Sequence, residues 1–389
     1  MLTCIQWPET PTPALAEAIS DNLKRWFQIN KRDLPWRGAD PYGVWVSEIM
    51  LQQTQVIVVI DYYNRFMKRF PNIESLAQAD ITDVLRIWSG LGYYSRARCL
   101  HQTARAVVEL YGGSFPSDKK SVLSLPGIGR YTAGAVLSIA FNRPEALVDA
   151  NVTRVLSRVF GVQGDPKSSD NISAIWSLAE SLVPKSEPGN YNQALMELGA
   201  LVCLPSDPKC GMCPIKQYCF AGNTSNPVQF PELVERKNVV HVSHSAAIIH
   251  GGDNSYWLIR RPESGLWGGL WEFPRVVCNP GETPMEGAER AAYEVLGWKV
   301  DAEQRVALVK HTVTHYQIAL HGVIVSPRMR KPWSIPQGIT ARCVPLSEME
   351  KYPCAAPQTK LRKALEHRFY NHHQQTTLPL EPLYLEEAK

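Results

Sequence analysis

Four cysteines in one short segment are the clearest candidates for metal ligands in this chain. The segment CLPSDPKCGMCPIKQYC has the spacing C-x6-C-x2-C-x5-C, which places thiols at Cys203, Cys210, Cys213 and Cys219. Thiolates bind both zinc and iron–sulfur clusters. Zinc modules usually carry two C-x2-C pairs, whereas this segment has one. The spacing alone leaves a zinc site and an iron–sulfur site open.

Two acidic residues lie where their surroundings would set their protonation. Glu48 lies in VWVSEIMLQQTQV between apolar side chains, and burial there would raise the pKa of its carboxyl group. Asp149 lies in VDANVTRVLSRVFG just before an expected helix, whose N-terminus favours an ionised carboxylate. The alternatives are a glutamate in a first helical turn and an aspartate that only caps its helix.

Two glycine-containing turns are candidates for DNA contact. In LPGIGRYTAGAV, Gly127 permits a tight turn and Gly129 permits close backbone approach before a helix whose free N–H groups can bind a phosphate. An ordinary corner between two helices is the alternative. In SGLGYYSRARCL, Tyr93 could intercalate and Leu91 could contact a base, unless the tyrosines only pack at the helix entrance.

The overall composition is that of a globular protein with no bulk affinity for nucleic acid. The net charge is +4 over 389 residues, and the charges of residues 1–235 cancel. The longest aliphatic run, VIVVI at 56–60, is too short to cross a bilayer. Nine cysteines and an N-terminus without a secretion signal argue against a disulfide framework and for a cytoplasmic protein. A DNA partner would have to be held by local geometry.

The sequence predicts an all-α region and an α+β domain, which together carry these candidate residues. Residues 14–220 have apolar residues near helical spacing and predict an all-α region. Its expected helices cover about 47–70, 82–88, 95–111, 130–141, 151–160, 171–182 and 191–202. Residues 226–241 are polar and turn-rich and predict a linker. Residues 242–370 alternate short strands with one helix near 285–296 and predict an α+β domain, followed by a tail at 371–389 without periodicity.

The order of these motifs resembles the MutY adenine DNA glycosylase family of the helix–hairpin–helix–GPD superfamily. LPGIGR resembles the hairpin of that superfamily, and Asp149 follows it at the position that faces the flipped nucleotide. The cysteine spacing resembles the [4Fe–4S] loop of this branch. The resemblance implies a helical region at 1–225, with a six-helix barrel at about 31–140 and an iron–sulfur module formed by 1–30 and 141–225.

The resemblance assigns roles to the candidate residues. Glu48 matches the catalytic acid and Asp149 the carboxylate that faces the sugar, while Tyr131 and Asn151 organise the water and the sugar. Positions that touch adenine match Arg32 and Gln193. Gln53 and Thr54 would wedge into the duplex, with Gln53 filling the gap left by the flipped base. The cluster would order a loop that offers Lys209 to the DNA backbone.

The second region resembles a Nudix fold adapted for recognition. GETPMEGAERAAYEVLGW matches a Nudix box at Arg290 and Glu294, but Ala291 and Val295 replace two glutamates that would hold Mg²⁺. We therefore expect no pyrophosphatase activity. HTVTHY resembles the loop that reads 8-oxoguanine, which usually has Phe-Ser-His. The hydroxyl is retained in Thr314 and the imidazole in His315, whereas the aromatic ring is lost at Val313.

The implied function is excision of adenine mispaired with 8-oxoguanine or guanine in double-stranded DNA, by a monomer that is associated with the nucleoid if the source is bacterial. Tyr131 stands where lyases of the endonuclease III type carry lysine, and a phenol cannot form a Schiff base. Together with Thr153, where some relatives have another lysine, this predicts a monofunctional enzyme. The alternatives are an endonuclease III-like lyase for oxidised pyrimidines, a DNA-tethered Nudix hydrolase and a non-catalytic iron–sulfur protein.

Overall fold

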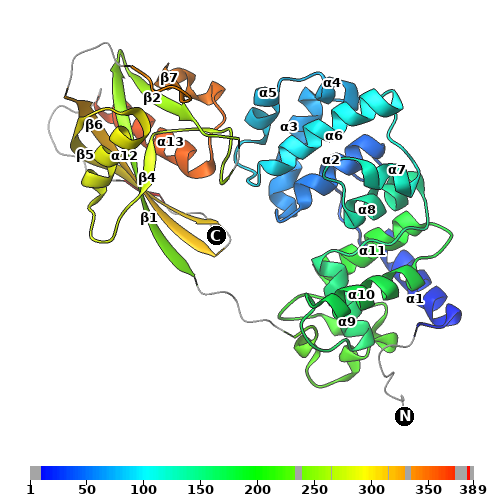
Figure 1. The fold of residues 1–389 in the computed structure, drawn as a ribbon. Coiled ribbons are helices and arrows are strands. Elements are labelled where there is room, and N and C mark those ends of the chain that lie inside the picture. Colours follow the sequence, from blue (N-terminus) through cyan, green and yellow to red (C-terminus); the bar gives the residue numbers. More distant parts are fainter. Residues whose placement is uncertain are drawn as a thin grey trace. The chain divides into compact units, whose positions relative to one another are not determined.

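The computed structural model describes residues 10–232, 239–263, 265–313, 315–328, 334–372 and 383–385. The chain forms two compact units (Figure 1). The first comprises Met1–Ala79 and Ser95–Glu235, and the second comprises Asp80–Tyr94 and Arg236–Lys389. No helix in the described part of the chain is long and apolar enough to cross a membrane. The domain boundaries expected from the sequence stay a prediction.

The first unit is entirely helical in its described residues, as the sequence predicts. Its α-helices are α1 (Pro13–Asn30), α2 (Pro41–Leu51), α3 (Val56–Arg69), α4 (Ile73–Ala77), α6 (Ser95–Tyr111), α7 (Lys119–Ser124), α8 (Arg130–Phe141), α9 (Ala150–Phe160), α10 (Ser169–Leu182) and α11 (Pro188–Leu201). Four short 3₁₀ helices follow: η1 (Cys210–Met212), η2 (Lys216–Tyr218), η3 (Ala221–Asn223) and η4 (Pro227–Gln229). Helix α5 (Ile81–Trp88) belongs to the second unit.

One expected helix is wrong in extent. The sequence predicts a continuous helix over 47–70, but the chain breaks between α2 and α3, where Gln53 has a φ of 55°. The buried Arg96 guanidinium donates to the carbonyl oxygens of Ile49, Met50 and Gln52, which are the groups that α2 leaves unpaired at its C-terminus. The break exposes a short polar loop between two apolar helices.

One apolar core packs α1, α8, α9, α10 and α11 together. Leu23 of α1, Leu156 of α9, Leu178 of α10 and Leu198 of α11 are each at most 2% exposed and pack together. Burying one such side chain stabilises the fold by about 1.5–3 kcal/mol. Gly189 of α11 allows close packing on α8, because a Cβ there would lie 2.5 Å from the Ser138 carbonyl oxygen. The core therefore fixes the starts of α9 and α11 relative to α8.

The second unit is a mixed sheet between two helices. Its strands are β1 (Val240–Gly252), β2 (Ser255–Arg260), β3 (Trp271–Glu272), β4 (Arg275–Val277), β5 (Val300–Val313), β6 (Tyr316–Pro327), β7 (Thr340–Pro345) and β8 (Leu383–Leu385). The order is β3-β2-β1-β6-β5-β8, with β4 paired to β1 and β7 to β2. Alternate residues of β1 face α12 (Pro284–Leu296) and α13 (Ala356–His372). The α+β prediction is confirmed.

The expected linker and tail fall partly outside the described residues. Within the linker predicted at 226–241, the structure has η4 and the first residues of β1, while residues 233–238 are outside the described part. The sequence predicts a tail at 371–389 without periodicity. Its described residues include the end of α13 and β8, which pairs in parallel with β5.

Candidate active site

The first unit has a cavity of about 700 Å³ that brings together residues from distant parts of the sequence. Helix α2 contributes Glu48, α8 contributes Tyr131, and the start of α9 contributes Asp149 and Asn151. Eight of the residues singled out in the sequence line this cavity: Arg32, Glu48, Gln53, Thr54, Tyr131, Asp149, Asn151 and Gln193. Two carboxyl groups about one hundred residues apart in the sequence therefore open into one chamber.

Glu48 has the environment of a carboxylic acid that holds its proton. Its side chain is 4% exposed, and burial raises its pKa to about 7, with a further upward contribution from the charge of Asp149. The Tyr131 hydroxyl donates to Glu48 Oε2 over 2.5 Å, which acts in the opposite direction. Burial also raises the pKa of Tyr131, so this phenol remains a donor. At neutral pH a large fraction of Glu48 is protonated.

Asp149 caps helix α9 and is held by a chain of hydrogen bonds. One oxygen accepts from the Val152 backbone N–H over 2.7 Å, and the other accepts from the Asn151 amide over 2.9 Å. Burial raises the pKa of Asp149, whereas these donors and the charge of Arg154 lower it. The helix N-terminus thus lowers the pKa of Asp149, as the sequence predicts. Burial has the larger effect, however, and the net pKa is raised.

Arg154 connects this carboxylate to the cysteine segment. Its Nη2 donates to Asn151 Oδ1 and to the Gly199 carbonyl oxygen, each over 2.8 Å. Its Nε donates to the Cys203 carbonyl oxygen over 2.8 Å. The guanidinium therefore fixes the Asn151 amide, which in turn fixes Asp149.

An ion-pair network around a buried glutamate also lines the cavity. The Glu197 carboxylate is 2% exposed and accepts from Arg32 Nε and Nη2 over 2.9 Å and from Arg37 Nη2 over 3.0 Å. Burial by itself raises the pKa of Glu197, but the arginines more than reverse this and the net pKa is lowered. Arg37 Nη1 also donates to Gln193 Oε1 over 2.5 Å. The motifs in the sequence do not identify Arg37 or Glu197. Glu197 could have been found, because it is an acid within the apolar stretch ALMELGAL, as Glu48 is an acid within an apolar helix.

The polar loop after α2 opens onto the same cavity. Gln52 to Gln55 line it, with the Thr54 hydroxyl accepting from Arg96 Nη2 over 3.3 Å. Leu91 and Tyr93 do not line it. Leu91 is buried, whereas Tyr93 is 45% exposed with a φ of 48°.

The predicted hairpin turn joins α7 to α8. Gly127 has a φ of 71°, and a Cβ there would lie 2.7 Å from the Cys99 Cβ, so this position requires glycine twice over. Gly129 caps α8 without a side-chain hydrogen bond, and a Cβ there would meet no atom within 4 Å. The Thr103 hydroxyl donates to the Pro126 carbonyl oxygen and anchors the turn on α6.

The four cysteines surround a second cavity. Cys203, Cys210, Cys213 and Cys219 are unpaired and line it together. Among the described residues, no three His, Cys, Asp or Glu side chains stand close enough to hold a single metal ion. Four thiols that line one cavity suit a metal centre with four thiolate ligands, which either zinc or an iron–sulfur cluster would satisfy.

Burial and hydrogen-bond donors have opposite effects on the protonation of these thiols. Burial raises the pKa of Cys213 to about 12 and that of Cys219 to about 11, so both would stay neutral without a cation. Arg158 Nη1 donates to Cys203 Sγ over 3.4 Å, and the Gly222 N–H donates to Cys219 Sγ over 3.3 Å.

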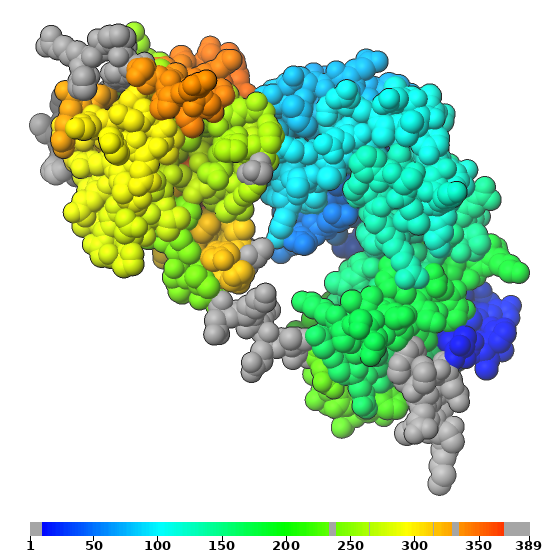
Figure 2. All heavy atoms as spheres, in the orientation of Figure 1, coloured from blue at the N-terminus to red at the C-terminus, as the bar shows by residue number. Residues whose placement is uncertain are grey.

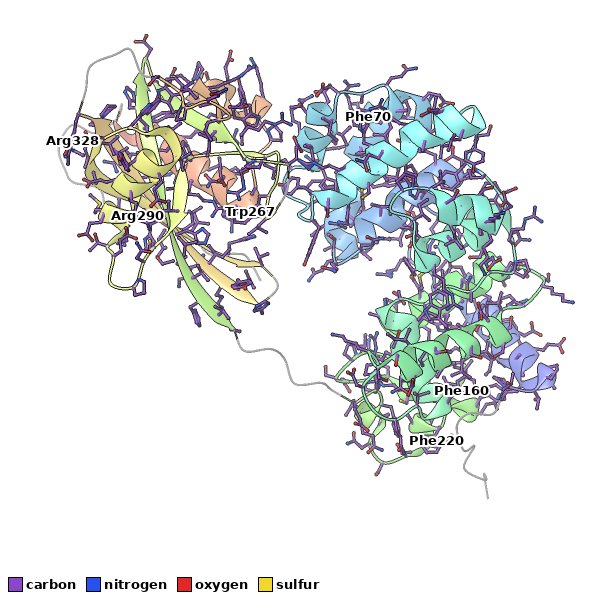
Figure 3. The ribbon with its side chains drawn as sticks, viewed as in Figure 1. Phe70, Phe160, Phe220, Trp267, Arg290 and Arg328 are labelled. Atoms are coloured by element: carbon purple, nitrogen blue, oxygen red, sulfur yellow. The ribbon has the colours of Figure 1, made fainter. Side chains whose placement is uncertain are left out.

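The cysteine segment docks on α9. The Phe220 N–H donates to the Val159 carbonyl oxygen over 2.9 Å, and the Phe220 ring covers Gly161, where a Cβ would clash with it. Figure 3 labels Phe220 and Phe160 in this part of the first unit. Lys209 is exposed at the start of η1. The segment thus presents a cation while Ile215 stays buried.

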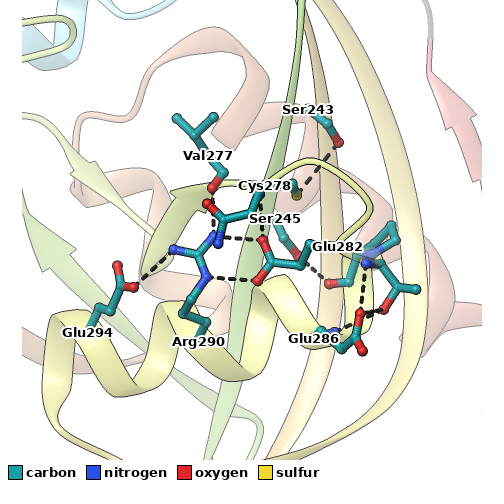
Figure 4. Close-up of polar contacts among 11 residues, drawn as sticks. Ser243, Ser245, Val277, Cys278, Glu282, Glu286, Arg290 and Glu294 are labelled. Atoms are coloured by element: carbon teal, nitrogen blue, oxygen red, sulfur yellow. Dashed lines mark hydrogen bonds and ion pairs between the residues drawn. The ribbon is translucent and has the colours of Figure 1, made fainter.

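In the second unit, Arg290 of the Nudix-box helix α12 is paired with glutamates of the same unit (Figure 4). Arg290 donates to both oxygens of Glu282 over 2.7 Å and to Glu294 over 3.0 Å. The Glu294 carboxylate is therefore paired with a guanidinium, and Ala291 and Val295 provide no oxygen beside it. Of the expected lesion-reading loop, Thr314 lies outside the described residues, and His315 lies at the β5–β6 connection.

Comparisons with known proteins agree with both units. Residues 46–181 match the HhH-GPD superfamily of base excision DNA repair proteins, and residues 245–364 match the NUDIX domain. The chain is 35% identical to the adenine DNA glycosylase of Mus musculus, covering 92% of this chain and 79% of that protein. It is 38% identical to the adenine DNA glycosylase of Buchnera aphidicola subsp. Schizaphis graminum, covering 66% and 74%.

Solved structures resemble parts of the chain. A thermostable thymine-DNA glycosylase is 34% identical and covers 52% of this chain and 94% of its own, with a TM-score of 0.48.

Proposed function

Since the chain belongs to the adenine DNA glycosylase family and removes adenine in base excision repair, we propose that its substrate is adenine mispaired with 8-oxoguanine, and also adenine opposite guanine. The observation that carries this proposal is that Glu48 and Asp149 line one cavity with different partners, since Glu48 accepts from a phenol and Asp149 accepts from the Val152 N–H and the Asn151 amide. An extruded nucleotide placed there would meet an acid and a carboxylate at the same time. Extrusion costs a few kcal/mol and costs least in a mispair.

Glu48 is the general acid in this proposal. Adenine is a poor leaving group as an anion, so a proton must reach the base, at N7, as the glycosidic bond breaks. A pKa of about 7 keeps the acid protonated in a large fraction of molecules near neutral pH. Such a group typically contributes about 10²–10⁴ in rate. The Tyr131 hydroxyl holds Glu48 in position and, together with Asn151, orders the sugar and the water.

Asp149 acts on the sugar. Loss of the base leaves an oxocarbenium-like centre, which its negative charge stabilises. On a retaining route the same carboxylate is also the nucleophile. Three contacts support the ionised form: the Val152 N–H, the Asn151 amide and the charge of Arg154.

The remaining residues bind the base and the duplex. Arg32 and Gln193 contact adenine, with Arg37 and Glu197 holding them in place. The residues that read or open the duplex are Gln53, Thr54, Leu91 and Tyr93. The hairpin N–H groups after Gly127 and Gly129 bind a phosphate, and Lys209 contacts the backbone.

The enzyme is a monofunctional glycosylase. Tyr131 and Thr153 carry no amine, so neither can form a Schiff base with the sugar. Borohydride reduction during turnover should trap no covalent protein–DNA adduct, as judged by gel mobility. A trapped adduct in the yield of a lyase would contradict this assignment and favour the endonuclease III-like alternative.

The four cysteines hold a [4Fe–4S] cluster. Its contribution is to cross-link the segment from Cys203 to Cys219, and the chemistry of base removal stays with the carboxyl groups. The second unit, at about 242–370, recognises the oxidised guanine through the loop containing Thr314 and His315. It has no pyrophosphatase activity, because the Glu294 carboxylate is paired with Arg290 and because Ala291 and Val295 stand where a Nudix box has glutamates. The enzyme works as a monomer on double-stranded DNA.

Single-turnover excision on duplexes containing 8-oxoG:A, G:A or thymine glycol tests the proposal. We expect fast excision from 8-oxoG:A, slower excision from G:A and none at thymine glycol. Asp149→Asn should abolish excision on the first two duplexes. Equal rates on 8-oxoG:A and on undamaged A:T would contradict it.

A further inference from the structure

The β5–β6 hairpin ends in a partly exposed apolar surface. Val313 and Tyr316 are direct partners across the hairpin, and Tyr316 also pairs with Val240 of β1. Directly paired residues point to the same face of a sheet. Val240, Val313 and Tyr316 therefore form one patch, which we call the hairpin-end patch.

This patch continues the face that builds the core. Going inward along the same face, Val309, Leu320 and Ala246 are at most 1% exposed and pack with α13. Going outward, Tyr316 is 41% exposed and Val240 is 42% exposed. In Figures 1 and 2 the ends of β1, β5 and β6 project from the body of the second unit. Exposed apolar side chains that cluster in this way are typical of a binding surface.

The aromatic ring in this patch is already held by its neighbour. The His315 and Tyr316 ring centroids are 4.1 Å apart, with 38° between the planes. A side chain that is restrained before binding loses less conformational entropy when it stacks on a ligand. The ring of Tyr316 thus lies against the ring of His315 at the end of the hairpin.

We propose that Tyr316 supplies the aromatic contact to the mispaired 8-oxoguanine that Val313 cannot supply. This inference rests on the proposed function, in which the hairpin loop reads the lesion. Cβ atoms of cross-strand partners lie about 4.5–5.5 Å apart, so a ring moved from position 313 to position 316 remains on the same face. Every base offers a π-face to such a ring, which acts as a stacking platform or as a wedge at the distorted pair.

The test measures binding separately from excision. The probe is a duplex with 8-oxoguanine opposite 2′-fluoro-2′-deoxyadenosine, whose fluorine disfavours the oxocarbenium-like sugar and so blocks cleavage. The reference is an undamaged duplex at the same salt concentration. Tyr316→Ala should weaken binding to the lesion duplex roughly 5- to 30-fold, the lower part of the range for one stacked base. Binding to the undamaged duplex should stay unchanged.

Three further variants separate stacking from a folding defect. Tyr316→Phe keeps the ring and should stay within about 2-fold of the wild type. Val313→Phe added to Tyr316→Ala restores a ring on the partner strand and should recover most of the lost affinity. Tyr293→Ala removes a tyrosine that is 57% exposed on α12 and should have no effect.

The outcomes distinguish this inference from the function on which it rests. If the wild type prefers 8-oxoG:A and Tyr316→Ala keeps that preference, Tyr316 has no stacking role and the inference alone is refuted. Equal losses on lesion and undamaged duplexes would make Tyr316 a general DNA contact and would also refute it. A wild type without preference for 8-oxoG:A refutes the proposed function, and the inference with it.

Discussion

Replacing Glu48 by glutamine should stabilise the protein at alkaline pH while abolishing its activity. The pKa of Glu48 is about 7 in the folded protein, against a reference value of 4.5. A raised pKa means that the folded protein binds the proton more tightly than the unfolded chain. Its contribution to stability is present below pH 4.5 and is lost as the pH rises through about 7. The difference of about 2.5 pKa units corresponds to about 3 kcal/mol.

Glutamine does not ionise, so the stability of the variant does not fall in this pH range for this reason. By the same linkage relation, about 2 kcal/mol of the effect falls between pH 5.5 and pH 8. Urea unfolding of the wild type and of Glu48→Gln gives the free energy of unfolding of each protein at these two pH values. The advantage of the variant over the wild type should be about 2 kcal/mol larger at pH 8 than at pH 5.5. Excision should fall by about 10²–10⁴ in the same variant.

Glu197→Gln is the matched control, because it changes a second buried glutamate in the wall of the same cavity. Burial alone raises the pKa of Glu197, but Arg32 and Arg37 bring it below the ordinary value. Removing its charge leaves two arginines without their partner and should destabilise the protein at neutral pH by roughly 3–5 kcal/mol. The two variants should therefore have opposite signs. A stability gain for Glu48→Gln that is equal at pH 5.5 and pH 8 would refute the reasoning.

Two other substitutions probe the same site, and a third probes the cavity lined by the cysteines. Tyr131→Phe removes the hydrogen bond that holds down the pKa of Glu48, so the alkaline fall of the single-turnover rate, expected near pH 7 in the wild type, should move up by about one unit in a pH–rate profile. An unmoved profile would mean that Glu48 is not the titrating acid. Arg154→Ala releases the amide that orients Asp149, and excision should slow about 10-fold or more while the Kd for an uncleavable duplex stays unchanged; a change confined to Kd would contradict this. Cys213→Ser should remove bound iron and visible absorbance and lower the melting temperature; full iron content would exclude Cys213 as a ligand.

Much of the local structure follows from short stretches of sequence. Asp149 caps α9 and Gly129 begins α8 because capping and turn chemistry depend on residues within three or four positions. The helix boundary at Phe141 and the Nudix-box helix at 284–296 follow from periodicity in the same way. The break at Gln53 does not, because it is stabilised by Arg96, more than forty residues away.

The active site likewise has features that the sequence determines and features that only the fold determines. The sequence alone determined which residue types were present: an acid in an apolar helix, an aspartate before another helix, a hairpin turn and four closely spaced thiols. Only the tertiary structure decided that Glu48 and Asp149 share one cavity, that Arg37 and Glu197 form its wall, and that Tyr316 faces the same way as Val313. The physical reason is that hydrogen bonding within a turn is local, whereas burial, and with it the pKa of Glu48, depends on side chains that meet only when the chain is folded.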